Sequence, residues 1–125
     1  MKLLPAALAV ALVLAPAAYA DCAYPPAPTQ IPDGSTATLN EMIAAMKVVK
    51  SYNEQMTAYL SCIELERDTR VASAGAPLTK QQKQELEIIE IQKHNAAVDQ
   101  LKAVANRFNA QVKIFKAKNK TTSSD

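Results

Sequence analysis

Two cysteines, Cys22 and Cys62, are the residues of this chain that most directly imply covalent chemistry. Their wide separation matches neither a C-x-x-C redox motif nor the ligand spacing of a zinc site. In a chain that begins with an export signal, an isolated pair of cysteines most simply forms one disulfide bond. We therefore predict a Cys22–Cys62 disulfide. Pairing between two chains and two free thiols are the alternatives.

A single histidine, His94, and the thioether of Met56 form a second candidate site. Imidazole and thioether ligands suit copper(I), so the two residues could contribute to a copper site in an exported protein. Methionine also fills gaps in helical interfaces, and a polar pair such as His94 with Asn53 can set the register of two helices. We favour this structural interpretation and expect no cofactor.

The remaining polar residues are not arranged as a catalytic site. No serine or cysteine has a histidine placed to activate it, and no glycine-rich phosphate loop is present. Acidic residues do gather in the middle of the chain, but arginines and lysines alternate with them, which is typical of a solvated helix surface. These acids are Glu64, Glu66, Asp68, Glu85, Glu87 and Glu90. We expect that the protein is not an enzyme.

The end of the chain is basic, with Lys113, Lys116, Lys118 and Lys120 close together. Such a surface could contact an anionic membrane or an acidic partner. Cations also stabilise the C-terminal end of a helix, and we prefer that explanation. The whole chain has 14 basic and 12 acidic residues, and this balance argues against a nucleic-acid binder.

Residues 1–20, "MKLLPAALAVALVLAPAAYA", carry one early lysine, an apolar run and a final Ala-Tyr-Ala. This layout is typical of a secretory signal peptide. Cleavage after Ala20 would leave residues 21–125, the size of one small domain, in the periplasm or outside the cell.

Two long helices must position these residues. Thr38 with Glu41 forms a capping box ahead of a helix predicted at about 38–70, and Thr79 with Gln82 forms another ahead of one at about 80–118. The segment "ASAGAP", residues 72–77, separates them. Long helices joined by a short loop pack antiparallel, so we predict an all-α, coiled-coil-like two-helix hairpin over residues 38–120. Residues 121–125 are expected to be a disordered tail.

Apolar residues at steps of three and four define a seam on each helix, through which the helices should pack. Pairing the helices about their loop places Asn53 within about a turn of His94 and Val98. The seams comprise Leu39, Met42, Met46, Val49, Asn53, Met56, Leu60 and Ile63, and Ile91, His94, Val98, Leu101, Ala105, Phe108, Val112 and Phe115. The flanking residues Ile43, Ile88, Ile89 and Ile114 make a homodimer possible.

A proline-rich arm, residues 21–37, precedes the hairpin and cannot form a helix or an inner strand. A second stripe on the first helix, which includes Tyr52 and Tyr59, is left uncovered by the other helix. Residues 22–38 can span about 50 Å when extended, and the helix from Thr38 to Cys62 is about 36 Å long. We therefore predict that the arm turns near Gly34 and runs back along the first helix, with Tyr24 and Ile31 covering the two tyrosines.

The run "CAYPPAPTQIPDGSTATLNEMIAAMKVVKSYNEQMTAYLSCIELE", residues 22–66, resembles small exported helical proteins of Gram-negative bacteria to which no function is assigned. The resemblance implies an envelope location and one motif containing both cysteines, but no activity. We expect a non-enzymatic binding or structural module. The alternatives are a chaperone-like or envelope-stress protein, a copper-binding protein, or an accessory subunit of an enzyme.

Overall fold

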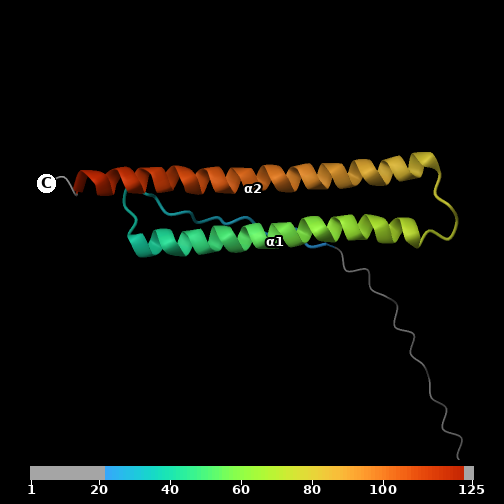
Figure 1. Cartoon of the computed structure of the whole chain (residues 1–125), viewed down its shortest axis with the longest axis horizontal. Coiled ribbons are helices and arrows are strands. Elements are labelled where there is room, and N and C mark those ends of the chain that lie inside the picture. Colours follow the sequence, from blue (N-terminus) through green and yellow to red (C-terminus); the bar gives the residue numbers. More distant parts are fainter. Residues whose placement is uncertain (1–21, 123–125) are drawn as a thin grey trace, which may run out of the picture.

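The computed structural model describes residues 22–122 and contains two helices, α1 (Leu39–Ala72) and α2 (Lys80–Thr122). The helices run side by side in opposite directions, and residues 73–79 join them (Figure 1). The predicted all-α hairpin is therefore confirmed. The predicted signal peptide, residues 1–20, and the last three residues of the predicted tail lie outside the described residues.

Both helices begin at the predicted capping boxes. The Thr38 backbone N–H donates to Glu41 Oε2 at 2.7 Å, and the Glu41 N–H donates to Thr38 Oγ1 at 3.3 Å. The backbone hydrogen bond holds the pKa of Glu41 below its usual value. Thr79 and Gln82 exchange the same two bonds, at 2.9 and 3.2 Å. Each helix start is thus determined by four consecutive residues.

Helix α2 is longer than its sequence predicts, because it continues to Thr122 instead of ending near residue 118. Asn119 Nδ2 donates to the Phe115 carbonyl at 3.0 Å, and Thr121 Oγ1 donates to the Ala117 carbonyl at 3.1 Å. These side chains bond back to the preceding turn and so accompany a helical backbone. The first two residues of the expected tail are therefore helical.

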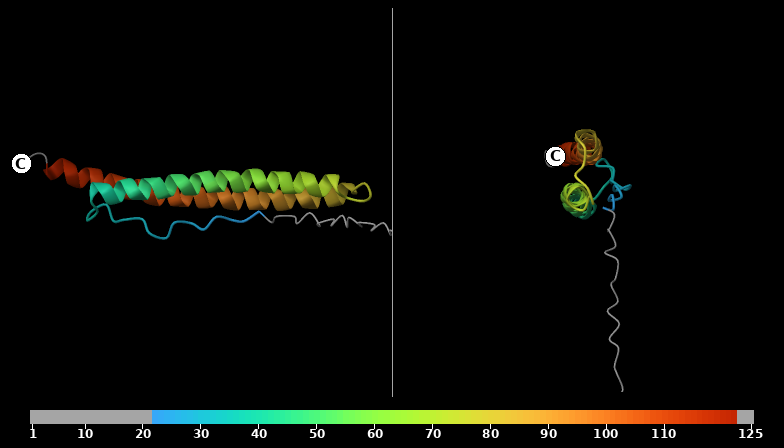
Figure 2. Two further views of the ribbon diagram at one scale, coloured as in Figure 1. Left: turned by 90° about the horizontal axis from the view of Figure 1, so that it is seen from below. Right: turned by 90° about the vertical axis from the view of Figure 1, so that its right-hand side faces the viewer.

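The arm precedes α1 as an extended segment and lies on one side of the hairpin (Figure 2). Asp33 forms the turn that reverses it: the Asp33 carboxylate accepts hydrogen bonds from the Ser35 N–H and Oγ–H, and its carbonyl accepts from the Ala37 N–H. The prediction of an arm packed along the first helix is confirmed. The arm also contacts α2, because Arg107 donates to the Pro28 carbonyl at 2.8 Å.

The core forms where both helices and the arm meet. Six buried residues make one cluster: Tyr52, Met56, Tyr59, Ile63, Ala97 and Val104. Cys22 and Ala27 of the arm pack against this cluster. The second stripe of α1 is therefore as important to the core as the predicted seam, since the arm supplies a third layer over it.

Gly34 allows the turn of the arm to touch the backbone of α2. Its N–H donates to Gln111 Oε1 at 2.8 Å. A Cβ atom at this position would lie 2.1 Å from the Gln111 carbonyl oxygen and 2.9 Å from the Phe115 nitrogen. These are backbone atoms of a helix, which cannot move aside as a flexible side chain would. Any residue other than glycine must push the arm away from α2.

We expect Gly34→Ala to lower the free energy of unfolding by about 1–3 kcal/mol, because the added methyl group overpacks this contact. Urea denaturation of the purified chain measures the change. Gly75→Ala is the matched control, because a Cβ there has no neighbour within 4 Å and no described glycine has a positive φ. Equal midpoints for both variants would contradict this account of the turn.

Candidate functional site

The arm covers one side of the hairpin and leaves the opposite side open, as the end-on view in Figure 2 shows. A groove of about 300 Å³ lies between α1 and α2 and has no arm residue in its wall. It is lined by Met46, Val49, Lys50, Tyr52, Asn53, Leu101, Val104, Ala105 and Phe108. We call the side of the hairpin that carries this groove the arm-free face.

Much of the predicted seam lies on the arm-free face instead of inside the hairpin. Met46 is 51% exposed, and Leu39 and Ile91 are also exposed. Val49, Leu60, Leu101 and Phe108 are only half-buried. The contact between the two helices therefore uses part of the heptad pattern, and the rest forms an apolar strip along an uncovered surface.

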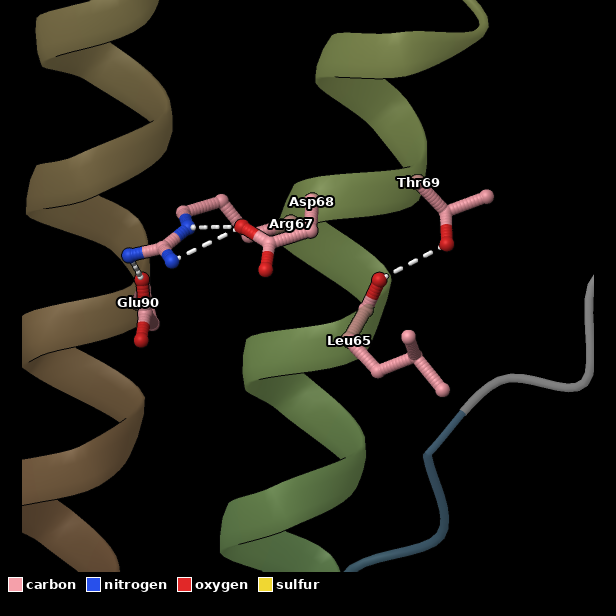
Figure 3. Close-up of polar contacts among 5 residues, drawn as sticks. All are labelled: Leu65, Arg67, Asp68, Thr69 and Glu90. Carbon is pink, nitrogen blue, oxygen red and sulfur yellow. Dashed lines mark hydrogen bonds and ion pairs between the residues drawn. The ribbon is translucent and has the colours of Figure 1, made fainter.

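Ion pairs near the loop show how α1 and α2 are aligned along their length. Arg67 of α1 pairs with Glu90 of α2 and with the neighbouring Asp68, as Figure 3 shows. Glu66 pairs with Arg70 and, at 3.5 Å, with Lys93. Three of the predicted cluster of acids, Glu66, Asp68 and Glu90, are thus paired with arginine or lysine on the helix surface. A pocket of about 40 Å³ beside them is too small for more than a water molecule or two.

This register corrects the predicted pairing of Asn53 with His94. Asn53 lines the groove with Val104 and Ala105, well over a turn away from His94 along α2. Asn53 and His94 are both exposed. The prediction assumed a tight, symmetric loop between the helices. The longer connection, residues 73–79, leaves α2 shifted along α1 relative to that pairing.

The structure does not bring the two candidate copper ligands together in an accessible site. Met56 is 0% exposed and belongs to the core, whereas His94 is exposed on α2. Within residues 22–122, no group of three or more His, Cys, Asp or Glu side chains could hold a metal ion. Met56 packs among the buried residues of the core cluster.

The predicted basic surface occupies the last turns of α2. Lys113, Lys116 and Lys120 are exposed, and Lys118 Nζ lies 3.5 Å from the Ala37 carbonyl of the arm. Neither described helix contains a segment long and apolar enough to cross a membrane.

The predicted disulfide joins Cys22 to Cys62, with a Cα–Cα distance of 5.8 Å. Beside it, the rings of Tyr24 and Tyr59 pack edge to face with centroids 5.0 Å apart. The bond and the ring pair hold the start of the arm on α1. Sequence reasoning missed the contacts of the arm with Arg107 and Gln111; the one available signal was a glycine directly after Pro-Asp in an otherwise extended segment.

Tyr52 separates the groove of the arm-free face from a second groove of about 250 Å³ beneath the arm. The second groove is lined by Pro26, Pro28, Val48, Ser51, Tyr52 and Gln55. The Tyr52 hydroxyl is buried and has no hydrogen-bond partner among the described residues. Burial, and secondarily the nearby Tyr24, raises the pKa of Tyr52.

No protein-family model matches this chain, and no curated protein or solved structure is significantly similar to it.

We expect the double variant Cys22→Ser/Cys62→Ser to lose about 4 kcal/mol of unfolding free energy, because the disulfide closes a loop with a sequence separation of 40 residues. Urea denaturation measures the loss, and the near-ultraviolet circular dichroism of the Tyr24–Tyr59 pair should weaken as the arm loosens. Ser61→Ala, at an exposed neighbour of Cys62, is the control. An arm that stayed ordered and equally stable without the bond would contradict this role.

We expect Tyr52→Phe to raise the free energy of unfolding by about 1 kcal/mol, because it removes a buried hydroxyl that lacks a partner. Tyr59→Phe is the control, since its hydroxyl is not such a group, and its midpoint should move little. A stability lower than that of the parent chain would show that the Tyr52 hydroxyl does have a partner.

The same variant should change the response to alkaline pH. The pKa of Tyr52 is raised above 10.0 in the folded chain. The neutral phenol therefore makes its full contribution to the free energy of unfolding below pH 10, and this contribution is lost as the pH rises through the pKa of the folded chain. Tyr52→Phe should therefore flatten the loss of stability as the pH rises above about 10. An unchanged slope would mean that the phenol ionises equally well in the folded chain.

Proposed function

We propose that this protein is a non-catalytic protein-interaction module that binds its partner through the arm-free face. The observation that carries the proposal is the groove of about 300 Å³ between the helices, lined by Met46, Val49, Leu101 and Phe108 and left uncovered by the arm. Apolar strips of this kind on small domains are typical of surfaces that bind other proteins.

The two sides of the hairpin differ in how firmly they are occupied. On one side the arm is held by a disulfide, by the Gly34–Gln111 bond and by the Arg107–Pro28 bond. A partner could reach that side only by displacing a covalently anchored segment. The arm-free face has no such segment, so a partner can make apolar contacts there without breaking any contact between the arm and the hairpin.

The groove fits side chains presented by a folded helical partner better than an unfolded client. A chaperone-like protein would need a broad concave surface, whereas this groove is confined to the line between α1 and α2. The chaperone-like function remains a prediction that no feature of the described residues favours.

We also propose that the protein works in the periplasm or outside the cell. Disulfides persist in such oxidising compartments, and the Cys22–Cys62 bond anchors the arm on which the core depends. The signal-like composition of residues 1–20 supports the same location.

Site-specific photo-crosslinking in exporting cells tests the proposed surface. We expect a photoreactive side chain at Met46, on the arm-free face, to form a defined protein adduct. The same side chain at Ala58, which is exposed elsewhere on α1, should form little or none. Equal adduct yields at both positions, or none at either, would argue against the arm-free face as the binding surface.

A further inference from the structure

We infer that the partner at the arm-free face is a second copy of this chain, packed in the antiparallel direction to form a four-helix bundle. The inference rests on the proposed function and identifies the partner. Three features of the described residues support it. The apolar strip is wide, four charged residues beside it have no ion-pair partner within residues 22–122, and the charge pairs on α1 and α2 have midpoints at nearly the same height, where one two-fold axis could pass.

The apolar strip is as wide as two helices. Met46 and Val49 come from α1, and Leu101, Ala105 and Phe108 come from α2. A single partner helix would cover only the line between them. A second hairpin presents two helices with the same strip, and such a pair of hairpins is the usual way in which a bundle completes its core.

Four charged residues flank the strip, two of each sign. Lys50 lines the groove, and Glu64 lies about five turns beyond Met46 on the same line of α1. On α2, Glu87 lies about five turns before Ala105, and Lys116 lies about three turns after it. None of the four forms an ion pair with another described residue. The lysines lie at the arm-turn end of the rod and the glutamates at the loop end.

The charges on each helix are symmetric about one point. Lys50 and Glu64 have their midpoint at Thr57, and Glu87 and Lys116 have theirs beside Leu101. The Arg67–Glu90 pair places these two midpoints at the same height to within about half a helical turn. One two-fold axis crossing both helices at this height would therefore satisfy all four charges at once.

Two pairs of apolar residues on α2 fit the same symmetry. The midpoint beside Leu101 also relates Val98 to Ala105 and Ile91 to Val112, so apolar residues would meet apolar residues across the axis. With α1 packed on α1 and α2 on α2, Lys50 of one copy would face Glu64 of the other, and Lys116 would face Glu87. A parallel arrangement would instead gather all the lysines at one end of the bundle and all the glutamates at the other, which is unfavourable.

Zero-length carbodiimide crosslinking of the disulfide-bonded chain gives a direct test. Lys50 and Glu64 are about 21 Å apart along α1, so an amide bond between them can form only between two chains. We expect a species of twice the monomer mass whose digest contains Lys50–Glu64 and Lys116–Glu87 crosslinks. A dimer that lacks both crosslinks, or that joins the two copies through residues outside the arm-free face, would overturn the antiparallel arrangement.

Charge reversal gives a second test that does not depend on crosslinking. Lys50→Glu/Lys116→Glu and Glu64→Lys/Glu87→Lys should each weaken self-association by about tenfold or more, because each places like charges opposite one another. Mixing the two variants should restore the parent affinity in a heterodimer, which sedimentation velocity and native mass spectrometry would detect. Asp99→Lys/Lys113→Glu, at exposed positions of α2 about a quarter turn of the helix away from Val98 and Ala105, is the control and should leave self-association unchanged.

The inference and the proposed function can fail separately. A chain that remains monomeric at all accessible concentrations, but whose Met46 photoadduct contains a different protein, overturns the second copy as partner and leaves the interaction surface in place. A monomer with no Met46-specific adduct overturns both.

Discussion

The covalent bond between Cys22 and Cys62 is the constraint on which the rest of the structure depends. Two helices alone share only one line of contact, and a hairpin of this size has little core. The bond holds an extended segment against the hairpin, so that Cys22 and Ala27 complete a cluster that includes Tyr52, Met56 and Tyr59. Because prolines restrict the backbone of the arm, ordering it costs less conformational entropy than ordering a flexible segment would. A segment without regular hydrogen bonds can therefore act as a structural layer.

The position of the arm also decides which surfaces remain available. At the turn, Gly34 touches the backbone of α2, and at the far end Cys22 is bonded to α1. The arm consequently bridges both helices on one side and stabilises their pairing. The same arrangement leaves the opposite side uncovered, although the heptad pattern places apolar residues there as well. The asymmetry of a small hairpin thus follows from one anchored arm.

Local features of the sequence predicted most of this fold. The Thr38 and Thr79 capping boxes located both helix starts, and the proline content with the tyrosine stripe predicted the arm and its direction. The register could not be predicted in the same way, because it depends on the path of residues 73–79 and on the long-range pair Arg67–Glu90. For the same reason the sequence placed Asn53 near His94. The contact of Gly34 with Gln111 was also inaccessible, since it joins residues far apart in the chain.

Only some residues of the predicted seam are buried in the monomer, although the seam is the most regular apolar pattern in the chain. A heptad pattern records which residues need an apolar neighbour, but not whether that neighbour belongs to the same chain. On α1 the most deeply buried residues include Met56 of the seam and Tyr52 of the stripe beside it, so the core extends from the seam toward the arm. Met46 and Phe108 are displaced toward the other side as a result. The monomer buries only part of this apolar pattern, and opposite charges flank the exposed part symmetrically. This is the arrangement expected of a surface through which the chain self-associates.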